Sequence, residues 1–155
     1  MTDLAPHYHV GIVVPDIAAA RDRFSEQLGV TWGPVLRLPR TDCRDHTGAD
    51  LVLPTTFCYS VDEPRLELIE EVPGTVWVCN EHSNLHHIGF WSDDLAAESA
   101  RLAGVGCPLQ LCGRAGDEAP ASFAYHRNEL GVRIEIVDTA MREAMGSFLF
   151  QPDDG

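Results

Sequence analysis

Two short stretches of this chain occur twice, and the repeat constrains the fold more than any other feature of the sequence. The segment from His87 to Leu95 matches the segment from His9 to Ile17 at an offset of 78 residues. Further along, RIEIV from Arg133 matches RLELI from Arg65 at an offset of 68 residues. The sequence therefore predicts two copies of one unit, each opening on a strand with a histidine and closing on a strand with a glutamate.

The length of the chain favours one domain built from both copies. A copy of roughly 75 residues buries too little surface to form a strong core alone, so the two copies are expected to share one. We expect a single domain over residues 1–155, with module one at about 5–72, module two at about 84–140 and a tail at 141–155.

Periodicity and turn residues predict the same order of elements in each copy, namely βαβββ. The expected strands are 9–14, 34–38, 51–60 and 65–70 in module one, and 85–91, 108–112, 122–126 and 132–137 in module two. The expected helices are 17–28, 94–103 and 139–145. The polar segment Arg40–Asp50 is expected to be a mobile loop, and the last five residues a frayed tail. The predicted class is α+β, with two paired modules forming one cup-shaped, curved mixed sheet.

Strand alternation places two histidines and two glutamates on the face of the sheet that points away from the helices. In each histidine strand, the neighbours of His9 and His87 form an apolar face suited to a helix, with Val10, Ile12, Ile88 and Phe90 buried under the helices. In each glutamate strand the same argument turns Glu67 and Glu135 away from the helices. If the modules face each other, two histidines and two glutamates meet, and buried carboxylates without a counter-charge are costly. The sequence therefore predicts a divalent metal site formed by His9, Glu67, His87 and Glu135, which suits zinc, nickel, cobalt, manganese or iron.

The same strands resemble a known family. HVGIVVPDI, RLELIEE, HHIGFWSDDL and GVRIEIVD are similar to the four signature strands of the vicinal oxygen chelate superfamily, and closest to its glyoxalase I and methylmalonyl-CoA epimerase branch. The resemblance covers nearly the whole chain. It implies paired βαβββ modules and one divalent metal ion held by His9, Glu67, His87 and Glu135.

The resemblance also implies a reaction. A divalent ion with two open positions can stabilise the enolate that forms when a proton is removed next to a carbonyl. The glyoxalase likeness implies that a ligand glutamate, Glu135 or Glu67, accepts this proton. The segment FAYHRNELGVRIEIV resembles an epimerase segment and adds His126 as another candidate base. The predicted function is a metal-dependent isomerase, epimerase or lyase, similar to methylmalonyl-CoA epimerase, that acts on a small or acyl-CoA substrate.

Two other functions remain open on the sequence alone. One is a glyoxalase-like lyase that acts on a thiol adduct, and the other is a ligand-binding protein of the resistance type without catalysis. Epimerases carry a general-base glutamate before the third strand of module one, where this chain has Asp42, Asp45, His46 and Asp50 instead. A dioxygenase is disfavoured because its metal triad contains one carboxylate, whereas this chain offers two.

The net charge limits which partners are expected, and the cysteine content indicates the cellular compartment. The chain has 24 acidic residues, 11 arginines and no lysine, which gives a net charge of −13. Such a charge repels nucleic acid and anionic membranes, so neither is an expected partner. Five cysteines without CxxC spacing indicate reduced thiols, and no secretory signal is recognisable, so a cytoplasmic protein is expected. The expected assembly is a homodimer.

Overall fold

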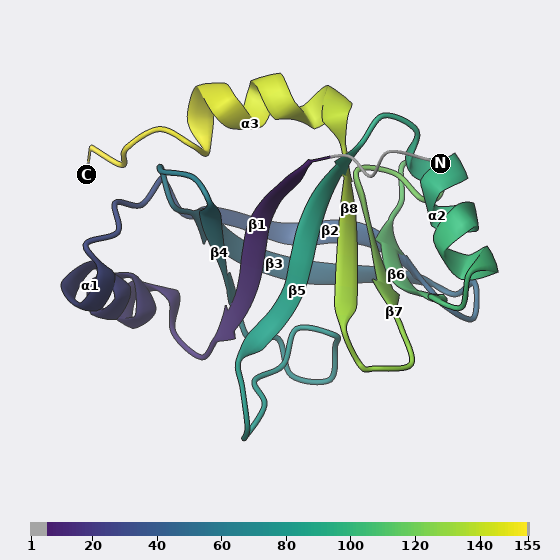
Figure 1. The fold of residues 1–155 in the computed structure, drawn as a ribbon, viewed down its shortest axis with the longest axis horizontal. Helices are drawn as coiled ribbons and strands as arrows, with labels where there is room; N and C mark the ends of the chain where they lie inside the picture. The colour runs from purple at the N-terminus through teal and green to yellow at the C-terminus, as the bar shows by residue number, and fades with distance from the viewer. Residues whose placement is uncertain (1–5, 155) are drawn as a thin grey trace. The chain divides into compact units, whose positions relative to one another are not determined.

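The computed structural model describes residues 6–154 and contains the predicted elements in the predicted order (Figure 1). In module one these elements are β1 His7–Val14, α1 Ile17–Leu28, β2 Leu36–Asp45, β3 Asp50–Tyr59 and β4 Arg65–Glu70. In module two they are β5 Leu85–Ser92, α2 Leu95–Gly104, β6 Leu109–Gly113, β7 Phe123–Arg127 and β8 Arg133–Asp138. A 3₁₀ turn, η1 Thr139–Met141, and α3 Arg142–Phe148 follow. The α+β class and the repeated βαβββ order are confirmed.

The chain divides into two compact units whose boundaries differ from those of the modules. The His9 unit comprises His9–Pro39, Pro54–His86 and Glu143–Gly155. The His87 unit comprises Met1–Tyr8, Arg40–Leu53 and His87–Arg142. Each unit therefore contains most of one module together with a segment from elsewhere in the chain. None of the helices within residues 6–154 is both long and apolar enough to span a bilayer.

The His9 unit is organised by the parallel pairing of β1 with β4 and the antiparallel pairing of β3 with β4. Asp16 caps the N-terminus of α1 by accepting a hydrogen bond from the Ala19 amide, and Gly29 ends this helix in the left-handed conformation at φ 69°. One side of the strands and one side of α1 then form a core cluster of buried residues, namely Ile12, Val14, Ile17, Trp32, Cys58 and Leu68. The predicted apolar face of β1 is thereby confirmed at Ile12.

The His87 unit repeats this plan. β5 pairs in parallel with β8, and β7 lies between β6 and β8 with antiparallel pairing on both sides. Asp94 caps α2 as Asp16 caps α1, by accepting from the amide of Ala97. The core under α2 is formed by the buried residues Leu95, Leu102, Cys107, Cys112, Ala124 and Ile136. Glutamate-strand residues of even number therefore face the helix, which leaves Glu135 on the opposite face.

The predicted burial of the histidine strands is only partly correct. Phe90 packs against the core of the His87 unit, but Ile88 is 38% exposed and Val10 is half-buried. The reason is the position of the helices. α2 packs mainly on β6, β7 and β8, and α1 packs mainly on β4, so Val10 on β1 and Ile88 on β5 are less well covered.

The prediction of a mobile loop at Arg40–Asp50 is wrong. β2 continues to Asp45 and β3 begins at Asp50, so this segment is a β-hairpin with a short turn. Its outer part pairs with β6, with Cys43 opposite Gly113 and Arg44 opposite Cys112. Polar side chains on a strand at a sheet surface carry no hydrophobic alternation, and the sequence pattern therefore resembles a loop.

The prediction that the last five residues are frayed is wrong at Asp153, and Gly155 lies outside the described residues. The backbone amide of Asp153 donates to the Trp32 carbonyl, and the Asp153 carboxylate lies 3.0 Å from the Arg21 guanidinium. Leu149 and Phe150 are buried. A side chain on Gly33 would collide with the backbone of Leu149, because an added Cβ would lie 2.0 Å from the Leu149 carbonyl oxygen. The tail thus packs on the His9 unit and depends on a glycine for its close approach.

Candidate metal centre

The first pair of predicted ligands lies within the His9 unit. Nε2 of His9 is 3.2 Å from Oε2 of Glu67, and the two residues are 0% and 5% exposed. The register of β1 and β4 explains this approach. Glu67 lies opposite Gly11 rather than opposite His9, so its carboxylate reaches diagonally towards the imidazole of the neighbouring strand.

The second pair repeats this geometry within the His87 unit. Nε2 of His87 is 3.1 Å from Oε2 of Glu135, and the residues are 3% and 5% exposed. Glu135 lies opposite Gly89, just as Glu67 lies opposite Gly11. The repeat in the sequence thus corresponds to a repeat in side-chain geometry. Imidazole nitrogens and carboxylate oxygens buried in contact are a donor set suited to a divalent cation.

A tyrosine accompanies each pair, and sequence reasoning did not identify this part of the repeat. Tyr59 lies opposite Glu67, and its ring is 5.6 Å from the ring of His9. Tyr125 lies opposite Glu135, and its ring is 5.1 Å from that of His87. The signal was present in the sequence, because FCY ends at Tyr59 and FAY ends at Tyr125, at an offset of 66 residues.

The surroundings of the two pairs differ. In the His9 unit, Tyr59 contacts Phe150 of the C-terminal tail edge to face, and the guanidinium of Arg65 lies 3.8 Å from the centre of the Phe150 ring. Arg65 also donates to the carbonyls of Ser60 and Val61. This pair therefore has an aromatic wall supplied by the tail. In the His87 unit, the ring of Phe123 lies 5.4 Å from that of Tyr125.

The structure places His126 apart from His87 and Glu135. Ala124 and Ile134 belong to the core under α2, so strand alternation turns His126 to this helix side and Glu135 to the other. The His126 ring is fully buried, with Nε2 at 2.9 Å from the Ser99 hydroxyl and Nδ1 at 2.7 Å from the Cys107 carbonyl. Burial lowers the pKa of His126, against smaller opposing effects of the Cys107 carbonyl and Glu98. These contacts favour a structural role for His126 over that of a base.

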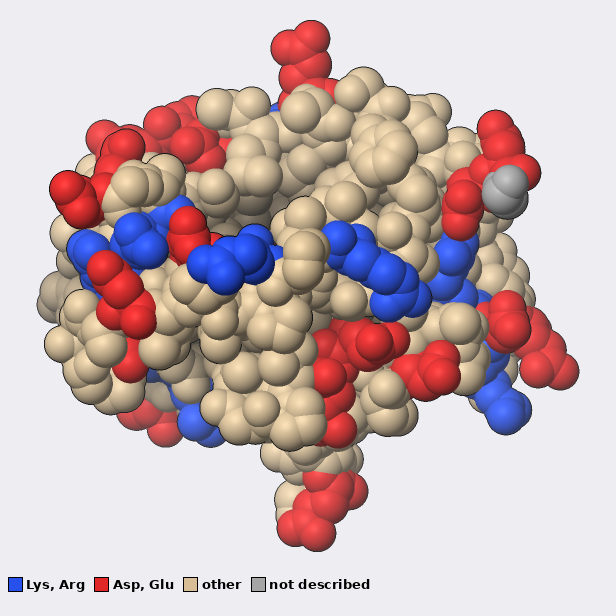
Figure 2. Space-filling model, turned by 180° about the vertical axis from the view of Figure 1, so that it is seen from behind, with Lys and Arg blue, Asp and Glu red and all other residues tan. Residues whose placement is uncertain are grey.

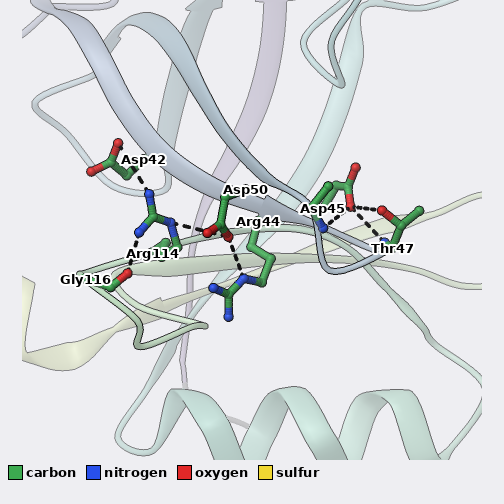
Figure 3. A network of polar contacts seen from close by, with 8 residues as sticks. Asp42, Arg44, Asp45, Thr47, Asp50, Arg114 and Gly116 are labelled. Atoms are coloured by element: carbon green, nitrogen blue, oxygen red, sulfur yellow. Dashed lines mark hydrogen bonds and ion pairs between the residues drawn. The ribbon is translucent and has the colours of Figure 1, made fainter.

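The acidic residues of the hairpin are held in a separate network (Figure 3). Asp50 lies 2.8 Å from Arg44 and 3.5 Å from Arg114, and Arg114 also lies 3.9 Å from Asp42. Asp45 accepts hydrogen bonds from Thr47 and from the Ala49 amide. Hydrogen bonds from Arg44 and Thr47 hold the pKa values of Asp50 and Asp45, respectively, below their ordinary value. Carboxylates stabilised in this way are weak bases.

The cysteines offer no activated nucleophile. All five are free, and four of them are buried. Burial raises the pKa of Cys43 to about 11 and that of Cys58 to about 12. Since the thiolate is the reactive form, these two thiols are inert at neutral pH.

Sequence comparison places most of the chain in one family model. The model described as "Glyoxalase/Bleomycin resistance protein/Dioxygenase superfamily" matches residues 8–125. A comparison with curated proteins found no match.

Solved structures with the same fold include several epimerases. A methylmalonyl-CoA epimerase in complex with methylmalonyl-CoA and NH4+ is 18% identical, with a TM-score of 0.62 over 89% of this chain and 96% of that chain. A variant of Streptomyces coelicolor methylmalonyl-CoA epimerase in complex with 2-nitronate-propionyl-CoA gives the same identity, TM-score and coverage. The methylmalonyl-CoA epimerase from Mycobacterium tuberculosis is 20% identical, with a TM-score of 0.54 over 93% of this chain and 95% of that chain. At these identities the likeness shows the fold.

Proposed function

The chain belongs to the glyoxalase/bleomycin resistance protein/dioxygenase superfamily, and we propose that it is a metal-dependent isomerase, epimerase or lyase that removes a proton next to a carbonyl group. The observation that carries this proposal is the occurrence of the same buried His–Glu pair in each unit, at 3.2 Å and 3.1 Å. Each of the four residues offers one ligand atom, and in the proposal all four hold a single divalent ion.

The donor set supports metal binding on chemical grounds. Two buried carboxylates carry a cost that a divalent cation offsets, and neutral imidazoles are common ligands of the same ions. When bound, such an ion withdraws charge from a substrate carbonyl and makes the adjacent C–H more acidic. The roles left to the protein are to orient the substrate, to exclude water and to accept the proton.

In the proposed mechanism all four residues would hold the ion, and Glu135 would leave it to accept the proton while His9, His87 and Glu67 keep the ion in place. The hairpin network supports this assignment, because Asp42, Asp45 and Asp50 are engaged with arginines or with a turn. His126 is engaged with Ser99 and Cys107 on the helix side. Glu135 is buried and therefore shielded from competing water, which favours proton transfer from a bound substrate.

The proposed substrate is a small carbonyl compound or an acyl-CoA thioester, in line with the ligands of the solved epimerases. An epimerase needs proton transfer on both faces of one carbon, which would require Glu67 as the second acid or base. A glyoxalase-like lyase on a thiol adduct is the second candidate. It is favoured by the engagement of the hairpin acids, which leaves module one without a base of the epimerase kind.

Metal analysis and hydrogen exchange test the proposal together. The purified protein is expected to bind one divalent ion per chain, and the metal-loaded protein to exchange the α-proton of at least one compound for deuterium. The panel contains acyl-CoA thioesters and thiol adducts of 2-oxoaldehydes, so the exchanging compound separates epimerase from lyase. Stoichiometric metal binding with no exchange across the panel would favour the ligand-binding alternative. Absence of metal binding would contradict the proposal.

A further inference from the structure

Two arginines lie opposite each other on neighbouring strands, and one of them is two residues from Glu135. Arg127 on β7 lies directly opposite Arg133 on β8, in the same continuous register that places Tyr125 opposite Glu135. Alternation puts Arg127 and Arg133 on the same face as Tyr125 and Glu135, away from α2. Two residues along a strand span about 6.7 Å, so the backbone of Arg133 lies about this far from that of the proposed proton acceptor, and Arg127 is its neighbour on β7.

The pairing of Arg127 with Arg133 has an electrostatic cost. Like charges directly opposite each other on neighbouring strands destabilise a sheet. Gln110 holds Arg133 in place by accepting a hydrogen bond of 2.7 Å from its Nε. A local conflict of this kind near a candidate site points to a ligand.

A surface cleft lined in part by Arg127 lies at the start of β6 and the end of β7. It has a volume of about 670 Å³, within the usual range for small-molecule pockets, and its lining includes Arg127, Gln110 and His46. Glu129 is the one acidic residue among those that line it. The only hydrogen bond of the Arg127 guanidinium within residues 6–154 is a long one, of 3.4 Å, from Nε to the Gly131 carbonyl.

The negative charge of the whole chain makes a local site with arginine necessary for an anionic substrate. A net charge of −13 repels an anionic substrate, which then needs a local concentration of arginine. On the face drawn in Figure 2, arginine and acidic side chains both reach the surface, and the chain as a whole has 11 arginines against 24 acidic residues. The arginine side chain suits this task, because its fork of donors pairs with carboxylate and phosphate oxygens in a bidentate manner.

Module one lacks this feature at the equivalent place. Arg65 corresponds to Arg133 in the repeat, but its guanidinium stacks on Phe150 and donates to Ser60 and Val61. Arg65 also has Glu63 at 3.5 Å. The paired arginines therefore distinguish the two halves of the molecule and do not follow from the repeat.

We infer that Arg127 and Arg133 form an anion subsite beside the His87–Glu135 pair, which binds a carboxylate or phosphate group of the substrate. This inference rests on the proposed function and extends it, because it selects carbonyl substrates with a second, anionic group. Arg127 and Arg133 are thus specificity-determining residues, and Gln110 is a positioning residue for Arg133.

The subsite can be tested without metal or turnover. Inorganic phosphate is titrated into metal-free protein labelled with ¹⁵N-arginine, and the Nε–Hε resonances are followed by NMR, with succinate in a parallel series. Saturable shifts of the Arg127 and Arg133 resonances are expected with one or both anions, and the stronger binder identifies phosphate or carboxylate as the preferred group. Arg127→Gln should weaken binding about tenfold, as expected for loss of a charged hydrogen-bonding group. Arg101→Gln, which removes an arginine paired with Glu98 on α2, should leave it unchanged.

A melting curve of each variant separates binding from folding. Arg127→Gln removes a like-charge contact, so its melting temperature is expected to be equal to or above that of the parent. Unchanged anion binding by Arg127→Gln, or lost binding with a lower melting temperature, would overturn the subsite. A parallel Co²⁺ titration of the parent distinguishes the two proposals. Metal binding without anion binding refutes the subsite alone, whereas anion binding without metal binding refutes the proposed function.

Discussion

The two His–Glu pairs have the same ligands, the same register and the same accompanying tyrosine, but different walls. The His9–Glu67 pair has Tyr59 backed by Phe150 and the stacked Arg65. The His87–Glu135 pair has Tyr125, and Arg127 and Arg133 lie next along the same face. The repeat thus preserved what a metal ion requires and varied what a substrate would contact. We therefore expect the first pair to act mainly in holding the ion and the second to act also in proton transfer.

The largest expected difference between the pairs is in the C–H step. Glu67→Gln and Glu135→Gln each keep the size of the side chain and one acceptor oxygen. Glu135→Gln should lower α-proton exchange per bound metal by ~10²–10⁴-fold, the usual contribution of a general base, and Glu67→Gln should lower it by less than about tenfold. Exchange is measured by NMR in D₂O on a substrate that the parent turns over.

His126→Ala serves as the comparison in that experiment. Because both ring nitrogens of His126 are hydrogen-bonded on the helix side, its exchange per bound metal should match that of the parent. If His126→Ala loses exchange while Glu135→Gln retains it, the proton acceptor is His126 and the assignment of Glu135 is wrong.

The aromatic wall of the first pair should contribute to stability. Phe150→Ala removes a buried ring that contacts Tyr59 and Arg65, and it should lower the free energy of unfolding by about 3 kcal/mol. Phe148→Ala, two residues earlier on α3 and 56% exposed, is the matched control and should change it by less than about 0.5 kcal/mol. Urea denaturation gives both values. Equal effects would mean that the tail does not form this wall in solution.

Metal removal tests whether the two pairs share one ion. A ligand present at 100 times its Kd stabilises the folded state by about 2.7 kcal/mol, so chelation should lower the melting temperature of the parent by about 5–10 °C. With one shared ion, His9→Ala and His87→Ala should both lose most of this dependence. If either variant retains a full shift on chelation, the remaining pair binds metal independently, and the shared site is excluded.

The smallest expected effect is a pH dependence that belongs to the second module alone. The pKa of His126 is below its ordinary value of 6.5 in the folded state, so the unfolded chain binds a proton first as the pH falls. This contribution to stability is present above pH 6.5 and is lost below it, by at most about 1.4 kcal/mol per pH unit. His126→Gln should show a smaller loss of stability between pH 6.5 and 5 in metal-free protein. If the stability of His126→Gln falls as steeply as that of the parent, the pH dependence belongs to other groups.

The parts of the fold that the sequence predicted are those where hydrophobic alternation and capping agree. Ile12 and Val14 mark one face of β1, and Asp16 and Gly29 delimit α1, so strand and helix were both identified. The repeat supplied the four candidate ligands, and the structure shows that His9 contacts Glu67 and that His87 contacts Glu135.

The parts that could not be predicted depend on contacts between distant segments. The polar hairpin is a strand pair because β6 is its partner, and the tail is ordered because Gly33 admits the backbone of Leu149. His126 shares a short segment with the candidate ligand Glu135, but one residue of strand register decides which face it occupies. Arg127 and Arg133 are six residues apart in sequence, and only the register of the hairpin sets them opposite each other.

Each compact unit includes a segment from outside its own module, and this limits how the chain can be cut and how it could have arisen. The His87 unit needs the hairpin strand around Cys43 from module one, and the His9 unit needs the helix and tail that follow module two. A gene fragment encoding module one alone, or module two alone, therefore specifies an incomplete unit. If the chain arose by duplication, its single-module ancestor had to assemble with a second copy that donated the missing segments. Fusion of two such copies would then have converted contacts between two chains into contacts within one chain.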